Sequence, residues 1–356
     1  MKSARTRTRT RTRTRTRTRT RTRTRTRTRI RLGVALLLVL VLAAAALAVR
    51  QRLDDPFGGP ATCCGWSKYA HNPVLGPGEG VIFDVTLLRD GGDYRMWNSW
   101  RTKGSIGYAT STDGLHWSRE TAVLGPLRSG WEDQVNRPSV LRGPDGLYRM
   151  WYTGQANGHS AIGYATSPDG VTWTRASDAP VLRPALAWEK VAVMAPNVLY
   201  DADQRLYRMW YSGGEQFEPD AIGYATSSDG IHWVRRPAPI FVPDPSHAWE
   251  QAKVTAAQVF RHGDWYYMAY IGFSDRDHAR IGLARSRDGI SSWQRLPANP
   301  IIGPGAGSAA WDCDAVYKPY MLWDGTTWLL WYNGRCGGVE QIGVALHPGE
   351  DLGFGG

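Results

Sequence analysis

The amino-acid sequence predicts an all-β fold, a five-bladed β-propeller with four strands in each blade. The main observation is a repeat: the phrase Ile-Gly-Tyr-Ala-Thr-Ser occurs three times and returns twice in degraded form. Successive copies are 56, 60, 59 and 61 residues apart and begin at Ile106, Ile162, Ile222, Ile281 and Ile342. A long period built from strand-like segments is typical of propellers. The 17 Trp and 16 Tyr agree with this fold, because large flat side chains fill the spaces between blades.

Each repeat is predicted to contain four strands, and the second repeat illustrates the pattern. An apolar run at Ser139–Arg142 is followed by an aromatic strand at Tyr148–Tyr152 and by the repeated strand at Ile162–Ser167. Asp169-Gly170 then forms a tight turn, because both residue types tolerate the positive φ of hairpin turns. A short strand centred on Trp173 completes the blade.

The fifth repeat stops after three strands, because nothing like Asp-Gly-x-x-Trp follows Ala345. The missing piece lies near the other end of the sequence. The segment Gly65–Leu75 matches Gly170–Leu182, and in both a Val follows the Trp by eight residues. We therefore predict that Trp66 begins the outer strand of the last blade. This pairing of the chain ends would close the ring and leave no open inner edge.

The positive charge of the sequence is concentrated at its N-terminus. Residues 1–52 contain 17 of the 43 Lys and Arg and no acidic residue, so the remainder holds 26 basic and 32 acidic residues. The body therefore has no basic face that would indicate nucleic-acid binding. The Arg-Thr run within residues 1–31 repels itself and buries nothing, which predicts a disordered cytoplasmic tail. A role of this run in binding RNA or lipid is the alternative.

An apolar run at residues 32–49 contains no charge and predicts a transmembrane signal-anchor, at the short end of the usual length. A cleaved signal peptide, which would leave a secreted protein, is the alternative. Because the larger positive charge precedes the run, we expect the propeller outside the cytoplasm in both cases. Residues 50–61 are then a linker, residues 62–346 the propeller and residues 347–356 a C-terminal tail. We expect a monomer held to the membrane by the helix.

Four cysteines in an exported chain suggest disulfides, and all four map to the fifth repeat. Cys313 and Cys336 fall on the same rim of the predicted propeller, so we expect them to pair. Cys63 and Cys64 either form a vicinal bridge or stay free. No set of Cys and His has the spacing of a zinc site, so we expect no metal and no cofactor.

The candidate active site comes from one column of the aligned repeats. Just before the prolines of the first strands, this column reads Asp84, Arg137, Ala195, Ala256 and Lys318. Asp84 lies inside an apolar run, where an acid is costly to bury without a partner. Arg137 and Lys318 are its natural partners. The three residues form either an ion-paired triad that stabilises the ring or a carboxylate held ionised as a base or nucleophile.

With this Asp on the first inner strand, the repeats resemble the five-bladed glycoside hydrolase superfamily over residues 62–346. The superfamily includes arabinanases and xylosidases of family 43, invertases and levansucrases of families 32 and 68, and mannoside phosphorylases of family 130. The resemblance implies that Asp84 acts as base or nucleophile, with a second Asp that tunes it and a Glu as general acid. The first strands of the third and fourth repeats carry no Glu. We therefore take Glu189 as the acid and Asp133 as the third carboxylate, although Glu189 belongs to a Trp-Glu pattern that is more often structural.

Carbohydrate binding is predicted from the loops on the same face. Trp100 departs from the repeat and could stack on a sugar ring, and mixed polar side chains surround it. The candidate substrate-binding residues are Trp100, Arg137, Glu215, His278, Lys318 and Arg335. Three functions remain open: a glycosidase acting on a glycan or oligosaccharide, a phosphorylase or transferase whose phosphate is held by Arg137, Lys318 and His278, and a non-catalytic sugar-binding propeller.

Overall fold

The computed structural model describes residues 62–128, 130–306 and 310–355. The predicted tail, membrane anchor and linker lie outside these residues. Within them, no helix has the length and apolar character needed to cross a membrane. The helical segments described are two short 3₁₀ turns, η1 (Arg101–Lys103) and η2 (Ala187–Glu189). The described part of the chain is otherwise built from strands and loops, as the repeat predicts.

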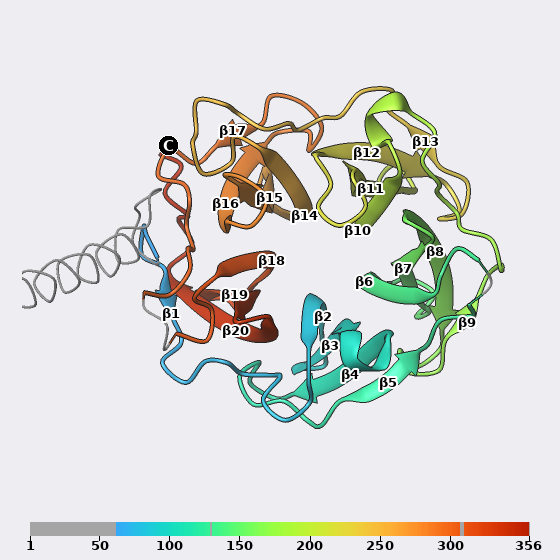
Figure 1. Cartoon of the computed structure of the whole chain (residues 1–356), viewed down its shortest axis with the longest axis horizontal. Coiled ribbons are helices and arrows are strands. Elements are labelled where there is room, and N and C mark those ends of the chain that lie inside the picture. The colour runs from blue at the N-terminus through green and yellow to red at the C-terminus, as the bar shows by residue number, and fades with distance from the viewer. Residues whose placement is uncertain (1–61, 129, 307–309, 356) are drawn as a thin grey trace, which may run out of the picture. The chain divides into compact units, whose positions relative to one another are not determined.

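The strands group into four-stranded antiparallel units, numbered I to V, whose first strands lie nearest a common centre (Figure 1). Unit I contains β2 (Ile82–Asp90), β3 (Asp93–Trp100), β4 (Ser105–Ser111) and β5 (Thr121–Leu124); unit II contains β6 (Gln134–Arg142), β7 (Tyr148–Ala156), β8 (His159–Ser167) and β9 (Thr174–Arg175); unit III contains β10 (Ala192–Asp201), β11 (Leu206–Gly214), β12 (Ala221–Ser227) and β13 (Val234–Arg235); unit IV contains β14 (Lys253–His262), β15 (Trp265–Phe273), β16 (Ala279–Ser286) and β17 (Gln294–Arg295); unit V contains β18 (Ala315–Trp323), β19 (Thr327–Cys336), β20 (Val339–Pro348) and β1 (Ser67–Lys68). A parallel pairing of Ala192 with Ser160 joins units II and III into one sheet.

The fourth strands begin later than the sequence predicts. Trp173 precedes β9 instead of lying within it, and its indole N–H donates to the carbonyl of Gly170 in the preceding turn (3.0 Å). In unit I, β5 begins four residues after Trp117. The repeated Trp therefore packs at the turn, and the short outer strand follows it.

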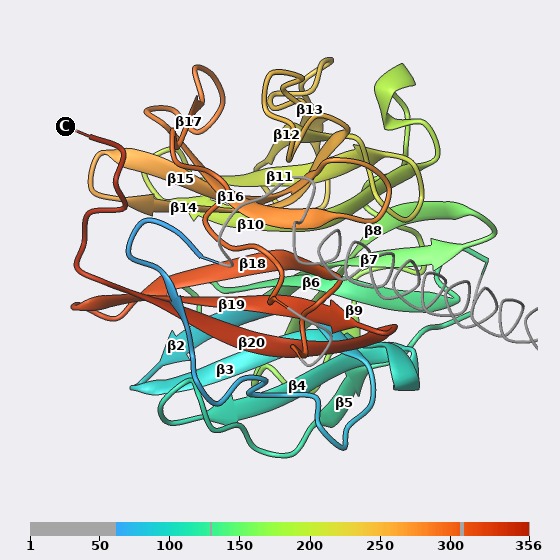
Figure 2. The same ribbon diagram turned by 60° about the vertical axis from the view of Figure 1, so that its left-hand side comes forward.

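Unit V is completed by the N-terminal strand, as predicted. Ser67 pairs with Leu346 and Lys68 pairs with Ala345, so β1 is the outer neighbour of β20 (Figure 1). The other strands of this unit, β18, β19 and β20, lie side by side in Figure 2. Trp66 is buried beside this pairing. The pairing of β1 with β20 fills the outer position that the fifth repeat leaves open.

Neighbouring units are joined by tryptophans of their second strands. In each case the indole N–H donates to the glycine carbonyl of an Asp-Gly turn in the next unit. These bonds are Trp97 to Gly170 (2.7 Å), Trp151 to Gly230 (2.8 Å), Trp210 to Gly289 (2.7 Å) and Trp331 to Gly114 (2.9 Å). The last of them joins unit V to unit I across the sequence ends. At the junction of units IV and V, which we call the seam, the equivalent residue is Ala269, and unit V has no Asp-Gly turn between its third and fourth strands that could receive an indole.

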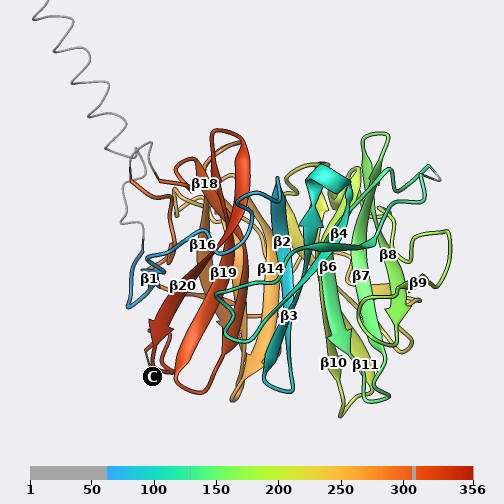
Figure 3. The ribbon, with the colours of Figure 1, turned by 90° about the horizontal axis from the view of Figure 1, so that it is seen from below.

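The first strands run side by side through the molecule, and each contains a β-bulge near its middle (Figure 3). One residue of every bulge has positive φ: Asp84, Arg137, Ala195, Ala256 and Lys318. These are the residues of the column that the aligned repeats singled out. Bulges of this kind redirect a side chain, and residues held in sparsely populated backbone conformations concentrate at functional sites.

Candidate active site

The bulges bring the variable column together around one pocket. The pocket is lined by residues of all five first strands, including Asp84, Arg137 and Lys318. In four units the bulge is held by a hydrogen bond from its backbone N–H to a side chain of a neighbouring unit: Asp84 to Asn333 (3.0 Å), Arg137 to Ser99 (2.7 Å), Ala195 to Thr153 (3.0 Å) and Ala256 to Ser212 (2.8 Å). The backbone at the centre is therefore held by contacts between units.

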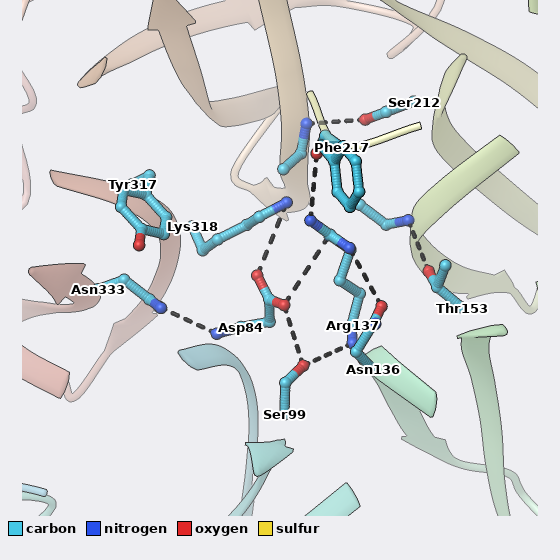
Figure 4. Close-up of polar contacts among 12 residues, drawn as sticks. Asp84, Ser99, Asn136, Arg137, Thr153, Ser212, Phe217, Tyr317, Lys318 and Asn333 are labelled. Atoms are coloured by element: carbon cyan, nitrogen blue, oxygen red, sulfur yellow. Dashed lines mark hydrogen bonds and ion pairs between the residues drawn. The ribbon is translucent and has the colours of Figure 1, made fainter. Parts of the chain in front are cut away.

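Asp84 is almost completely buried, with 3% of its surface exposed, and Figure 4 shows it between two cations. Its Oδ2 accepts a hydrogen bond from the Ser99 hydroxyl at 2.9 Å. The Nε of Arg137 lies 3.8 Å from Oδ2, and the Nζ of Lys318 lies 3.7 Å from Oδ1. Both cations neutralise the carboxylate, but neither is within hydrogen-bonding distance of it.

Arg137 and Lys318 are buried cations with unused donors. Arg137 donates from Nη1 to the Asn136 side chain at 3.1 Å and from Nη2 to the Phe217 carbonyl at 3.4 Å. Its Nε and the Nζ of Lys318 are enclosed and have no hydrogen-bond partner among the described residues. Burial, together with the charge of Arg137, lowers the pKa of Lys318 to about 8. A buried unpaired donor is costly, so an anion or hydroxyl that accepted from both would be stabilised here.

Glu218 is a further acid at this centre, and the sequence analysis missed it. It lies on the loop between β11 and β12, and its carboxylate oxygen Oε2 is enclosed without a hydrogen-bond partner in the described structure. Burial raises the pKa of Glu218, while the nearby charges of Lys318 and Arg137 oppose that shift. A carboxyl with a raised pKa suits a general acid. The unit III loop is longer than its counterpart between β7 and β8, and this difference was the available signal.

Parts of this chain are similar to known proteins. Residues 178–304 match the model of glycoside hydrolase family 130, described as β-1,4-mannooligosaccharide phosphorylase. A 1,2-β-oligomannan phosphorylase of Thermoanaerobacter sp. is 33% identical over 133 residues, which cover 34% of this chain and 43% of that protein. An uncharacterized protein of Mycobacterium tuberculosis is 32% identical over 161 residues, 42% of this chain and 52% of that protein. The chain thus spans about half the length, or less, of these curated relatives.

One solved structure is similar to this chain in fold over most of its length. It represents family 130 mannoside phosphorylases, a family described as containing glycoside hydrolases that target β-1,2-mannosidic linkages in Candida mannan. The two folds agree with a TM-score of 0.64 over 83% of this chain and 98% of that one, at 18% identity. The fold is therefore that of known propeller glycoside hydrolases, and residues 178–304 are similar in sequence to family 130. The propeller centre at Asp84 is therefore the place to look for its chemistry.

The carboxylate of Glu189, the predicted general acid, is fully engaged in hydrogen bonds and an ion pair within its own unit. Its Oε2 accepts from the backbone N–H groups of Ala185 (2.7 Å) and Leu186 (2.9 Å), and Arg235 lies 3.1 Å away. Its Oε1 accepts from the Tyr211 hydroxyl at 2.7 Å. Glu189 is not among the residues that line the central pocket. Because its oxygens already bind the loop and the outer strand, we correct its assignment to a structural one.

A similar arrangement recurs in units II, IV and V, which explains the repeated Trp-acid pattern. Glu132 accepts from Tyr152 (2.8 Å) and pairs with Arg175 (2.9 Å). Glu250 pairs with Arg295 (2.6 Å), and Asp312 pairs with Lys68 (2.6 Å). Each acid thus ties the second strand or the entering loop to the fourth strand of its own unit.

Trp100 does not offer a stacking face, so this expectation is corrected. Its side chain is buried with 7% exposure, and its indole N–H donates to the Glu79 carbonyl at 2.8 Å. Trp131 and Trp188 also pack inside the fold, against the repeated glycines Gly154 and Gly213. Trp100 and these two repeated tryptophans are therefore part of the packing of the units.

The remaining predicted residues divide between a second pocket and the rim. Glu215 and Arg335 line a cavity next to the centre, together with Glu218. His278 is bonded to Asp275 at 2.7 Å and does not line the pockets described here. Asp133 is exposed and is likewise absent from their linings. The structure therefore brings together Asp84, Arg137 and Lys318, but not Asp133 or His278.

The cysteines form two disulfides. Cys313 pairs with Cys336 between the start of β18 and the end of β19, and Cys63 pairs with Cys64. Ligand atoms of Cys313, Asp314 and Cys336 lie within 4.8 Å of one another. Both sulfurs are committed to the disulfide, so this group does not offer thiolates to a metal.

Proposed function

We propose that this protein is a glycan-acting enzyme on a five-bladed propeller, with units I to V as its blades, and that it transfers a glycosyl group to inorganic phosphate. The observation that carries the proposal is the pair of buried cations, Arg137 and Lys318, whose unused donors converge beside Asp84. Hydrolysis does not require two cations at the reaction centre, whereas binding a phosphate dianion requires positive charge to balance it. The partial match to mannooligosaccharide phosphorylases supports the same reaction.

The described residues suggest a division of roles. Arg137 and Lys318 would hold phosphate through charge-assisted hydrogen bonds, with Asp84 keeping the two cations apart and oriented. A phosphate oxygen attacks the anomeric carbon as the bond from that carbon to the glycosidic oxygen breaks. Glu218, whose pKa is raised by burial, would give its proton to the leaving oxygen. The products are a glycosyl phosphate and a saccharide with a free hydroxyl, and Glu218 regains a proton from solvent.

We take β-mannosides as the substrate class, because the matched relatives are named for β-1,2- and β-1,4-mannoside phosphorylases. The experiment incubates the protein with β-1,2- and β-1,4-mannobiose, with and without phosphate. Formation of mannose 1-phosphate that requires phosphate supports the proposal. Release of free mannose at the same rate without phosphate would contradict it.

Hydrolysis is the second candidate, favoured by the position of Asp84 between two cations that stabilise its charge. Here Asp84 would act as base on a water, and Glu218 as acid. The same incubation separates the two reactions by their products. Asp84→Asn should abolish hydrolysis, because an amide cannot accept the proton of the water.

We also propose that the propeller lies outside the cytoplasm, held there by residues 32–49. The two disulfides support an oxidising location, where such bonds persist. Protease added to intact cells should degrade the propeller, while a cytoplasmic control protein stays intact. Protection of the propeller until the cells are lysed would rule out this location.

A further inference from the structure

A second pocket adjoins the centre on the side of units III, IV and V. It has a volume of about 460 Å³, within the usual range for small-molecule sites. Its walls come from the loop after β11, the loop after β15 and the β18–β19 hairpin. Two residues of this pocket connect it to the centre. Glu218 interacts electrostatically with Lys318 and Arg137, and Tyr317 directly precedes Lys318 in the sequence. A ligand in the pocket would therefore extend away from the reacting groups.

The chemistry of the pocket is aromatic and close to neutral. Three aromatic side chains contribute to it: Phe217, Phe273 and Tyr317. Its charged residues nearly balance, with three basic and four acidic side chains: Lys253, Arg276, Arg335, Glu215, Glu218, Asp277 and Glu340. A pocket without a strong excess of either charge does not select an ion, but its many donors and acceptors suit hydroxyl groups.

Several of these charges already have partners. Lys253 pairs with Glu215 at 3.0 Å, and Arg335 donates to the Asp277 carbonyl at 3.2 Å. Glu340 accepts from the Tyr317 hydroxyl and pairs with Arg101 at 3.0 Å. These contacts hold the side chains in place, so the polar wall is organised before a ligand enters.

Phe217 stands out on this wall. Its side chain is 71% exposed, and it is the aromatic member among the large apolar side chains that the described chain exposes. Its backbone carbonyl accepts a hydrogen bond from Arg137, which holds the Phe217 backbone beside the centre (Figure 4). An uncovered ring on a pocket wall offers an apolar face that a sugar ring can cover.

We propose that this pocket binds the leaving-group part of a neutral oligosaccharide and that Phe217 is its stacking platform. The inference rests on the proposed function, because it places the scissile bond between Asp84 and Glu218. It assigns oligosaccharide specificity to the loop between β11 and β12. The longer loop of unit III therefore supplies both the proton for the leaving group and the surface that holds it.

The test measures binding and turnover separately. Binding of β-mannotriose is titrated to Asp84→Asn protein that carries Phe217 unchanged, Phe217→Ala or Phe217→Trp. We expect Phe217→Ala to weaken binding roughly tenfold, as for loss of one aromatic contact, and Phe217→Trp to restore it. Val234→Ala is the matched control, since Val234 is 74% exposed on β13. It should leave binding unchanged.

Turnover shows which proposal fails. Circular dichroism first checks that Asp84→Asn and Asp84→Asn/Phe217→Ala are both folded. If these two proteins then bind mannotriose with the same affinity, the stacking role of Phe217 is overturned. If wild type binds mannotriose through Phe217 but makes neither mannose 1-phosphate nor mannose from it, the pocket stands and the proposed function fails. If wild type turns mannotriose over and Phe217→Ala has the same kcat/KM, the proposed function stands and the pocket inference fails.

Discussion

At the scale of single residues, the centre contains buried charged side chains that the fold has to stabilise. Asp84, Arg137 and Lys318 are each less than one-tenth exposed, and removing one member of such a group leaves the others uncompensated. Three atoms of this group are enclosed without a hydrogen-bond partner in the described structure. This arrangement costs stability in the free protein and favours a ligand that completes it.

Lys318→Met tests the cationic half of the centre. We expect the KM for phosphate to rise roughly 10- to 100-fold, the usual effect of losing a hydrogen bond to a charged group. In wild type the same KM should rise as the pH passes about 8, because Lys318 loses its proton there, and the variant should lack this rise. Initial rates at several phosphate concentrations from pH 6 to 9 measure both effects. Lys190→Met, at a half-exposed lysine paired with Asp220, is the control and should behave as wild type.

Glu120 makes stability depend on pH. Asn98 donates to Glu120 Oε1 at 2.7 Å, and burial raises the pKa of Glu120 to about 7. Glu120 Oε2 and Asn98 Oδ1 are both enclosed and unpartnered among the described residues, and a Cβ on Gly107 would lie 2.5 Å and 2.7 Å from them. A protonated Glu120 can donate to the amide oxygen, whereas a carboxylate meets it as a second acceptor.

The pKa of Glu120 is raised in the folded state. The stability that protonated Glu120 contributes is therefore fully present below the unfolded pKa of about 4.5 and is lost as the pH rises through 7. We expect the free energy of unfolding to fall by up to about 3 kcal/mol between pH 4.5 and 8 from this group. Urea unfolding across that range measures it. In Glu120→Gln, which keeps both hydrogen bonds at every pH, the decline should flatten; an unchanged decline would assign it to other groups.

At the scale of elements, the units are joined by a small set of repeated contacts. In four units one second-strand indole donates to the Asp-Gly turn of the next unit, and in four units the bulge N–H of the first strand donates to a side chain of a neighbouring unit. The same bulges that aim Asp84 and Arg137 inward are thus part of the contact between units. Binding chemistry and ring stability depend on the same backbone.

Trp151→Phe isolates one of these contacts. It removes the indole hydrogen bond to the Gly230 carbonyl, which still accepts from the indole of Trp233 (3.1 Å), so we expect the loss of this bond to lower the free energy of unfolding by about 0.5–1.5 kcal/mol. Thermal or urea unfolding measures it. The matched truncation Trp265→Phe should cost less, because that ring packs 3.8 Å below Arg287 and makes a cation–π contact that Phe also provides. Equal losses would argue against the indole bond.

At the scale of the whole molecule, the ring depends on its N-terminal strand. Trp66 packs with Leu296 and Leu352 at the seam, where no indole bond joins the units. Trp66→Ala should cost about 3–5 kcal/mol, as for other large buried aromatics. Hydrogen exchange should rise first in β20 and β16, on the two sides of the seam. A uniform rise in all units would mean that the ring unfolds as one body instead.

The sequence was enough to predict the repeat, the closing strand and the column of Asp84, Arg137 and Lys318, because these follow from local periodicity and from aligning similar segments. It was not enough for Glu218, because the loop that carries it differs in length from the corresponding loops of the other repeats and does not align with them. Trp100 and Glu189 were assigned to the site because their residue types suit sugars and acid catalysis. Whether such a side chain faces the pocket or the interior depends on the path of its loop and on its hydrogen-bond partners. For Glu189 one such partner is Tyr211, and aligning the repeats does not reveal it.

The alanine at position 269 has a consequence for how the protein is made. Where the other second strands present an indole, Ala269 leaves space that Trp66, Leu352 and their neighbours occupy from opposite ends of the chain. Residue 352 leaves the ribosome long after residue 66, so the nascent propeller keeps one apolar edge uncovered until the segment around residue 352 has been made. The final residues of β20 and the segment after it therefore decide when that edge is hidden from other chains.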